Sequence, residues 1–328
     1  MSFSLQICRA LLAACAGLVA AIGPAAADTF PVVIEHAFGE TVIPERPVRV
    51  ATVSWANQEV PLALGVVPVG FARADFGDDD GDGLLPWVAA RLEELGAETP
   101  TLFNEGDGID FEAVAASEPD VILAAYSGLN RSDYDKLSKI APVVPYRDGA
   151  WATDWREMIR LNAAGMGMSE EGEALIGRIE GQIAEAAARY PATQGKSVMF
   201  ITHLDVRDLS VIRFYTTNDT RVKFLADLGF VSPPSVRAAG GGFAGEISAE
   251  RIDEIADVDV IVAYGGQAVG DEVSRNLLTG LVPAVARGSV VLLGNDPLGT
   301  AANPTPLSIP YVLDDYFARL NEAALKAE

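Results

Sequence analysis

A long amphipathic helix near the middle of the chain constrains the fold more than any other feature. The segment begins at Ser169, whose hydroxyl can cap the first turn, and ends before Pro191, which cannot continue a helix. Leu175, Ile179 and Ile183 recur every fourth residue and give the helix one apolar face. At about 1.5 Å per residue, about twenty residues make a rod roughly 30 Å long, which is close to the width of a small domain. We therefore expect a rigid strut.

Apolar segments alternate with helical segments on both sides of this helix. Before it, we expect strands over residues 48–53, 66–72 and 121–125, and helices over 57–64, 84–95, 109–117 and 134–140. After it, we expect strands over 197–202, 211–215, 258–263 and 290–293, and helices over 221–228, 249–256 and 307–324. Such alternation indicates parallel sheets with helices on both faces. The predicted fold is α/β: two doubly wound lobes, 28–168 and 191–328, joined by a single long helix, 169–190, with a ligand cleft between them.

The first 27 residues have the features of a secretory signal. Arg9 precedes an apolar run that is too short to span a membrane, and three alanines follow a Gly-Pro break. We expect cleavage after Ala27 and a periplasmic protein that begins at Asp28. The sequence Leu12-Ala13-Ala14-Cys15 resembles a lipoprotein cleavage box, so a lipid-anchored form is the alternative.

Charge and cysteine content exclude several classes of function. Removing 27 of 328 residues leaves 301, enough for two domains, and removing Arg9 changes the formal charge from −22 to −23. Such a charge argues against binding nucleic acid or anionic lipid. Both cysteines, Cys8 and Cys15, lie in the leader, so we expect no disulfide or thiol chemistry in the mature chain.

The candidate ligand-binding residues are those that follow strands. In open α/β sheets, ligands bind beyond the carboxyl ends of the strands. Aromatic and arginine side chains recur at these places, which suits a large, flat or anionic ligand that is stacked on rings and held by guanidinium groups. The candidates are Trp55, Arg73, Tyr126, Ser127, Arg213, Tyr215, Phe243 and Tyr264.

Several segments, spread over nearly the whole mature chain, carry a family resemblance. They are residues 109–114, 118–124, 126–129 and 134–144, the segment Leu64-Gly65-Val66-Val67-Pro68-Val69-Gly70, Trp151 with Trp155-Arg156-Glu157, residues 224–225 and 228–230, Ile247-Ser248-Ala249-Glu250-Arg251-Ile252, and Pro306-Leu307-Ser308-Ile309-Pro310-Tyr311. This pattern resembles the periplasmic iron–siderophore-binding proteins of ABC importers.

The resemblance implies a function and a set of partners. Members of the family have two α/β lobes and one long helix, and they deliver a ferric siderophore, haem or cobalamin to a membrane permease. We expect no cofactor, a ferric siderophore as ligand, and a monomer. The resemblance places one permease-docking glutamate on each lobe, and the matching positions are Glu112 and Glu250.

An acidic loop offers a weak calcium-binding candidate. Asp78, Asp80 and Asp82, with Gly83 shortly after, resemble the first half of a calcium loop. Position twelve would be Ala89, where a bidentate glutamate is expected, so a solvated acidic loop is the favoured interpretation.

Three rival functions differ in what they require of the sequence. Zinc or manganese carriers need several imidazoles, whereas this chain has only His36 and His203, far apart in the sequence. A haem or cobalamin carrier remains the main alternative, because a tyrosine such as Tyr126, Tyr215 or Tyr264 could ligate haem iron. A secreted hydrolase is disfavoured, since the chain has no Gly-x-Ser-x-Gly elbow and no cysteine nucleophile outside the leader.

Overall fold

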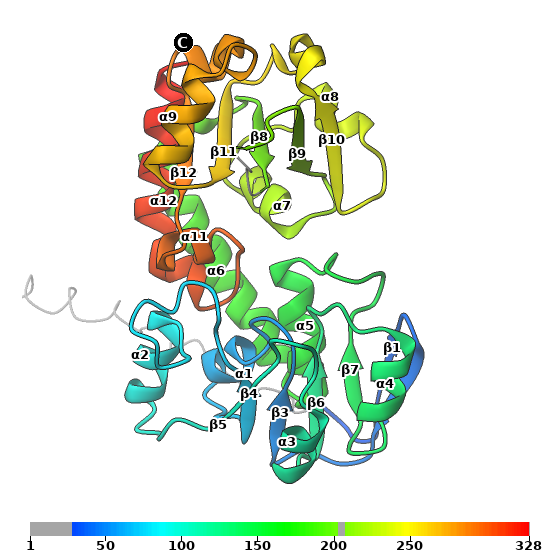
Figure 1. Cartoon of the computed structure of the whole chain (residues 1–328). Coiled ribbons are helices and arrows are strands. Elements are labelled where there is room, and N and C mark those ends of the chain that lie inside the picture. The colour runs from blue at the N-terminus through cyan, green and yellow to red at the C-terminus, as the bar shows by residue number, and fades with distance from the viewer. Residues whose placement is uncertain (1–27, 203–206, 328) are drawn as a thin grey trace, which may run out of the picture.

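The structure is a computed structural model that describes residues 28–202 and 207–327. It consists of two lobes with α6 (Ser169–Arg189) running between them (Figure 1). The expected leader and the cleavage site after Ala27 lie outside the described residues. Among the residues described, no helix combines the length and apolar character that crossing a membrane requires.

The N-terminal lobe is built on a five-stranded parallel sheet of order β5-β4-β3-β6-β7. Its central strands are short and buried on both faces, as expected where helices cover a parallel sheet. The strands are β3 (Val50–Thr52), β4 (Gly70–Ala72), β5 (Thr101–Phe103), β6 (Val121–Ala124) and β7 (Val143–Pro145). The helices are α1 (Glu59–Ala63), α2 (Pro86–Glu94), α3 (Phe111–Ala116), α4 (Arg131–Leu137) and α5 (Trp155–Gly165), and the hairpin β1 (Val32–His36) and β2 (Gly39–Ile43) precedes them.

The C-terminal lobe has a mixed sheet of order β10-β9-β8-β11-β12. Strand β8 (Val198–Ile201) is parallel to β11 (Val260–Tyr264), which is parallel to β12 (Val290–Leu293). Strands β9 (Val211–Tyr215) and β10 (Ala244–Ser248) are antiparallel to their neighbours. A purely parallel sheet was expected here. The segment 202–210 is too short for a parallel crossover, which takes a dozen or more residues, so β9 turns back beside β8.

Several short helices and the long helix α12 surround this second sheet. They are η1 (Pro191–Thr193), α7 (Thr220–Asp227), α8 (Pro234–Ala238), η2 (Ala249–Ile255), α9 (Gln267–Arg275), η3 (Thr279–Leu281), α10 (Pro283–Ala286), α11 (Pro297–Ala301) and α12 (Ser308–Leu325). The α-helix expected over residues 249–256 is a 3₁₀ segment with a kink at Arg251. Helix α7 lies on the side of the lobe that faces the N-terminal lobe (Figure 1).

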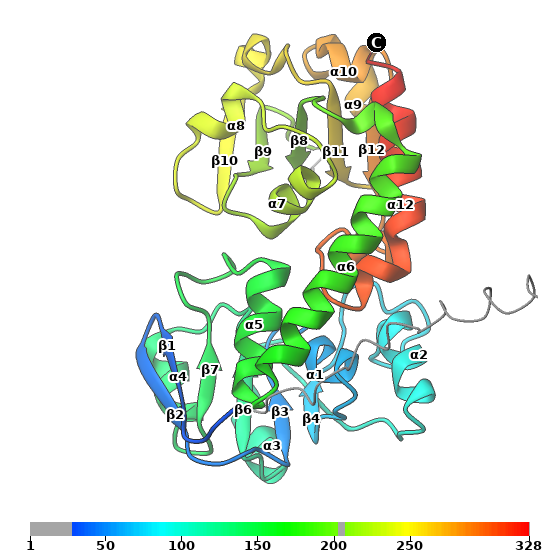
Figure 2. The ribbon, with the colours of Figure 1, turned by 180° about the vertical axis from the view of Figure 1, so that it is seen from behind.

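Helix α6 is accompanied by a second structural connection between the lobes. Helix α12 packs along its C-terminal half, and α11 with the following turn lies beside the N-terminal lobe (Figure 2). The buried Glu59 carboxylate of α1 accepts hydrogen bonds from the Thr305 hydroxyl and, at 3.2 Å, from the Leu307 amide. The Asn295 side chain accepts from the Gly77 amide at 2.8 Å, so both ends of the segment 295–307, which lies in the predicted C-terminal lobe, contact the N-terminal lobe.

A clasp between α5 and α7 fixes the lobes on another side. The Trp155 indole donates to Asp227 at 3.0 Å, and the Arg156 guanidinium pairs with the same carboxylate at 2.9 Å. Lys223 donates to the Ala152 carbonyl oxygen at 2.8 Å. Three polar contacts thus hold α7 against the start of α5 and against Ala152 just before it, which favours a stiff arrangement of the lobes.

Candidate functional site

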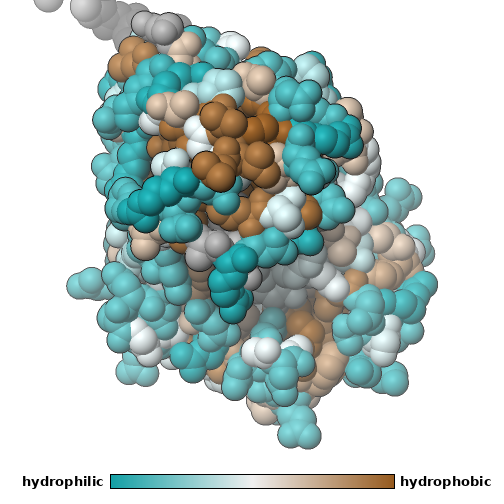
Figure 3. Space-filling model, turned by 45° about the horizontal axis from the view of Figure 1, so that its top comes forward, coloured by the Kyte–Doolittle hydropathy of each residue, from teal (hydrophilic) through white to brown (hydrophobic). Residues whose placement is uncertain are grey.

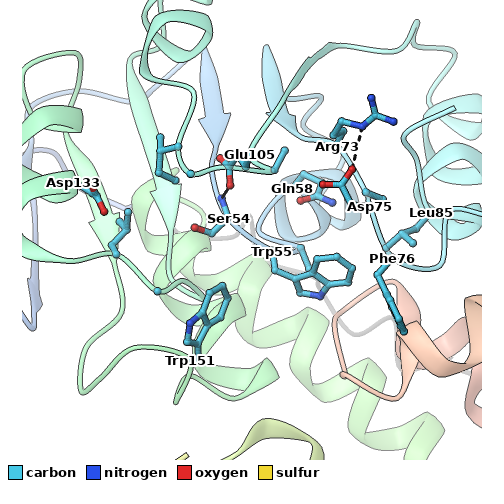
Figure 4. A pocket seen from close by; sticks show the side chains of 17 residues that line it. Ser54, Trp55, Gln58, Arg73, Asp75, Phe76, Leu85, Glu105, Asp133 and Trp151 are labelled. Carbon is cyan, nitrogen blue, oxygen red and sulfur yellow. Dashed lines mark hydrogen bonds and ion pairs between the residues drawn. The ribbon is translucent and has the colours of Figure 1, made fainter. Parts of the chain in front are cut away.

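Two adjoining cavities form a cleft at the junction of the lobes. One, of about 370 Å³, is lined from both lobes, and the other, of about 390 Å³, lies on the N-terminal lobe. Trp55, Phe76 and Trp151 line both cavities, so the two spaces adjoin along these rings (Figure 4). The C-terminal lobe contributes Arg221, Phe243 and Tyr264, and the segment containing α11 contributes Thr300 and Asn303. Aromatic walls with a few convergent polar groups are typical of small-molecule sites.

Asn57 locks the turn that presents Trp55. Its side chain donates to the Val53 and Tyr126 carbonyl oxygens at 2.8 and 2.9 Å, and it accepts from the Tyr126 amide at 3.1 Å. The residues on either side of Trp55, Ser54 and Ala56, have positive φ values of 62° and 61°, which side-chain-bearing residues rarely adopt. The network holds this strained turn in place and thereby fixes Trp55 and Tyr126 at the ends of β3 and β6.

Trp151 is held against the end of β6 from the other side. Its amide donates to the Ser127 carbonyl oxygen at 3.0 Å, and its φ is 59°. A Cβ atom at Gly128 would lie 2.6 Å from the Trp151 indole nitrogen, so only glycine allows this close approach. The rings of Trp151 and Tyr126 then meet edge to face, with centroids 5.2 Å apart.

Arg221 is the cation that the C-terminal lobe presents to the cleft. Its guanidinium pairs with the fully buried Asp219 at 2.9 Å, donates to the Tyr264 hydroxyl at 3.2 Å and lies over the Tyr215 ring at 4.4 Å. Only 13% of its side chain is exposed. Asp219 also caps α7 by accepting from the Arg221 amide at 2.8 Å. The guanidinium is thus preorganised, and it can meet an anionic or carbonyl oxygen without losing side-chain freedom.

The cleft tyrosines are held in their neutral form. Burial raises the pKa of Tyr126 and that of Tyr215 to about 12, although Arg221 opposes the rise in both. Burial raises the pKa of Tyr264 as well, and again Arg221 opposes it. These phenols can donate hydrogen bonds, but their conversion to phenolate is costly.

Glu105 is a half-buried acid on the wall of the N-terminal cavity, next to Ser54 (Figure 4). Its Oε2 accepts the Ser54 amide at 2.9 Å. Desolvation, aided by the nearby Asp110 charge, raises the pKa of Glu105 to about 7, and the hydrogen bond from Ser54 only partly opposes this.

The structure brings most of the predicted ligand-binding residues to the cleft. Trp55, Arg73, Tyr126, Phe243 and Tyr264 line a cavity. Ser127 is buried beside Trp151, and Tyr215 lies beneath Arg221 and against Phe243, with ring centroids 5.3 Å apart.

Arg213 is the exception, because it lines neither cavity and, unlike the buried Ser127 and Tyr215, its side chain is exposed. It lies within β9 between the buried Ile212 and Phe214, so strand alternation points it away from the core. Its exposed side chain lies 3.7 Å from Glu246 of β10.

Several cleft residues, Glu105 among them, were absent from the predicted set. Arg221 was not predicted because it lies at the start of a helix and not at the end of a strand. Phe76 and Trp151 lie in loops, and Asn303 joins the cleft only because α11 lies against the other lobe. The family resemblance included Trp151 with Trp155-Arg156-Glu157, and this was the sequence signal that pointed to Trp151.

Glu112 and Glu250 occupy equivalent places on the two lobes. Each is exposed in the first turn of a short helical segment, α3 or η2, and each segment is capped by the preceding Asp110 or Ser248. Neither lines the cleft. Apolar atoms gather on the end of the C-terminal lobe (Figure 3), where the exposed large side chains include Leu277, Leu278 and Leu281.

The three aspartates of the acidic loop lie close together. Oxygen atoms of Asp78, Asp80 and Asp82 lie within 4.8 Å of one another, and these carboxylates accept amide hydrogen bonds from their own loop. Calcium binding there stays a prediction.

His36 is buried in the N-terminal hairpin and lies 2.9 Å from the Thr41 hydroxyl, whereas His203 lies outside the described residues.

Comparison with known proteins shows which family model this chain matches and which proteins it is similar to. The model of the family described as "Periplasmic binding protein" matches residues 50–297. PiaA of Streptococcus pneumoniae, solved in complex with ferrichrome, superposes with a TM-score of 0.87 at 41% identity, covering 90% of this chain and 100% of PiaA. FatB of Vibrio anguillarum, a ferric-anguibactin-binding protein, is 26% identical over 306 residues, which are 87% of this chain and 86% of FatB.

A third relative matches over a shorter stretch. YfiY of Bacillus subtilis, a probable siderophore-binding lipoprotein, is 26% identical over 202 residues, which are 61% of this chain and 57% of YfiY. The family match, by contrast, covers well over half of the chain. The chain therefore belongs to the periplasmic binding protein family, and it is a binding protein, not an enzyme.

Proposed function

We propose that this protein captures a ferric siderophore in the cleft between its lobes and delivers it to the permease of an ABC importer. The observation that carries the proposal is the cleft itself, in which aromatic rings from both lobes surround one preorganised guanidinium. The relationship to PiaA, whose structure contains ferrichrome, supports the same ligand class.

The charge balance of the cleft favours a siderophore without a large negative charge. Arg221 is paired with Asp219 and Arg73 with Asp75, at 2.9 and 3.3 Å. No lysine lines either cavity among the described residues. A ferric tris-catecholate is strongly anionic and would need free cations to replace its hydration, whereas a ferric tris-hydroxamate is neutral. We therefore infer a hydroxamate siderophore of the ferrichrome type.

Haem is a weaker candidate for this cleft. A tyrosine ligand to haem iron must bind as phenolate, and the pKa of Tyr126 and of Tyr215 is raised to about 12 by burial. The Tyr264 hydroxyl already accepts a hydrogen bond from Arg221. The available phenols are therefore suited to donate hydrogen bonds to ligand oxygens.

A fluorescence titration tests the proposed ligand. Trp55 and Trp151 line both cavities, so a bound ferric chelate should quench the protein's fluorescence. We expect ferrichrome to produce saturable quenching, and Trp151→Phe to reduce its amplitude. Replacing Trp87, which lies outside the cavities and donates to Glu59, is the matched control for the loss of one fluorophore. Absence of saturable quenching and of ferrichrome retention on a desalting column would contradict the proposal.

Delivery requires a second surface, and Glu112 and Glu250 are our candidates for it. Their equivalent, exposed positions on the two lobes suit a receptor with two similar arginine-bearing subunits. Segment η2, which contains Glu250, also packs against η3, beside the exposed Leu277, Leu278 and Leu281. An exposed apolar patch next to a carboxylate is typical of a macromolecular docking surface.

The protein acts outside the cytoplasm, as its family membership indicates. We propose a soluble periplasmic form that begins at Asp28. The relatives YfiY and YhfQ of Bacillus subtilis are named lipoproteins, and Cys15 would supply the lipid attachment in a corresponding form of this chain. The intact mass of the exported protein distinguishes the two, because a diacylated species beginning at Cys15 would exclude cleavage after Ala27.

A further inference from the structure

The Glu105 carboxyl is the acidic group in the cleft that lacks a counter-charge. Its Oε2 accepts the Ser54 amide, while its Oε1 is enclosed and has no hydrogen-bond partner in the part of the chain that the structure describes. No ion pair joins Glu105 to a cation among the described residues, although the side chain lines the N-terminal cavity.

The other charges of this cavity are balanced locally. Arg73 and Asp75 form an ion pair of 3.3 Å, visible as the dashed line in Figure 4. Asp133 of α4 accepts from the Asn130 side chain at 2.7 Å and lies 3.9 Å from Lys136. Once these pairs are set aside, the cavity retains the charge of Glu105, reinforced by Asp110 at the start of α3.

We propose that Glu105 is a specificity-determining residue, which favours ferric siderophores that carry a protonated amine over otherwise identical neutral ones. This inference rests on the function proposed above and names a chemical class within it. A carboxylate in a partly desolvated wall has lost water that a cation in the cavity can replace. The attraction is stronger there than at the surface, because the cavity walls exclude much of the solvent.

The protonation state of Glu105 provides a second signature. Because burial raises its pKa to about 7, the group is mostly neutral at pH 6 and mostly ionised at pH 8. A ligand ammonium favours the ionised form, so binding below neutral pH must release a proton. The preference for the charged ligand should therefore grow as pH rises from 6 to 8. Asp110, Asp133, Asp75 and Arg73 are the other charged groups around the cavity.

The test compares two ligands with the same iron centre. Ferrioxamine B has a pendant ammonium group, and its N-acetyl derivative lacks that charge. We expect wild-type protein at pH 8 to bind ferrioxamine B about tenfold more tightly than the acetylated form, the size of one charge-assisted contact, with a smaller ratio at pH 6. Glu105→Gln should bring the ratio near one at both pH values.

Controls separate this inference from the proposed function. Glu98→Gln removes an exposed carboxylate from the same lobe, outside the cavities, and should keep the wild-type ratio. Equal affinities of wild-type protein for the two ligands, or an undiminished preference in Glu105→Gln, would overturn the role of Glu105. If ferrichrome still bound in that case, the proposed function would stand. Failure of all three chelates to bind would overturn both. The pH series on wild-type protein needs no variant and is unaffected by a folding defect.

Discussion

Replacement of Glu59 by glutamine should change how stability depends on pH. The Glu59 carboxyl is completely buried where α1 meets residues 305–307, and it accepts from the Trp87 indole at 2.8 Å. Desolvation raises its pKa from 4.5 to about 7, although hydrogen bonds from Thr305, Trp87 and Leu307 oppose the rise. The folded state therefore holds this proton at pH values where the unfolded chain has released it.

The sign and size of the effect follow from this difference. Between pH 4.5 and 7 the unfolded state binds fewer protons than the folded state, so the free energy of unfolding falls as pH rises. One pKa unit corresponds to about 1.4 kcal/mol, so the full fall attributable to Glu59 is about 3 kcal/mol. The contribution is fully present below pH 4.5 and is lost above about pH 7.

Urea unfolding at a series of pH values measures this contribution. The glutamine side chain of Glu59→Gln cannot ionise. Its amide group faces the Leu307 N–H and should lower the free energy of unfolding by an amount that does not vary with pH. The free energy of unfolding of wild type minus that of Glu59→Gln should therefore decrease as pH rises from 5 to 7. The contributions of the other carboxylates are the same in both proteins and cancel in this difference. A difference that stays constant over this range would refute the assignment.

The remaining predictions concern binding and delivery. Arg221→Ala should lower ferrichrome affinity about ten- to a hundredfold, as measured by fluorescence titration. It should also lower the free energy of unfolding by about 3–5 kcal/mol, as measured by urea unfolding, because the buried Asp219 loses its partner. Arg221→Lys, which keeps the charge, should be less affected in stability. Glu112→Ala and Glu250→Ala should leave ferrichrome affinity and stability unchanged but reduce uptake in cells, and the double Arg variant should abolish uptake. A loss of ferrichrome affinity in the purified variants would contradict the assignment of these residues to the docking surface. Small-angle scattering curves with and without ligand should nearly superpose, because α6, the Glu59 contacts and the Asp227 clasp resist opening; a large drop in radius of gyration would contradict this.

The fold was predictable because its signals are local. Ser169, Pro191 and the four-residue spacing of Leu175, Ile179 and Ile183 mark α6 within two residues of its observed ends. The residues at or just after the ends of β3, β6 and β11 were identified because the carboxyl ends of parallel strands share one edge of a sheet. That rule found Trp55, Tyr126 and Tyr264, which line the cleft.

The rest depends on contacts that no local pattern encodes. The Glu59–Thr305 hydrogen bond joins residues 246 positions apart, so nothing near Glu59 in the sequence marked it as buried. Arg213 was chosen by position, but its neighbours Ile212 and Phe214 take the buried positions of β9. Arg221 acts in the cleft because α7 begins there, and the antiparallel course of β9, which was not anticipated, leads into that helix.

The most direct test of the account is to locate the iron in crystals of the protein grown with ferrichrome. Anomalous scattering at the iron absorption edge identifies the metal without prior assumptions about the ligand. The account predicts one strong peak per chain between Trp55 and Trp151 on one side and Arg221 on the other. An iron peak at the Asp78–Asp82 loop or elsewhere on the surface, with the cleft empty, would contradict it.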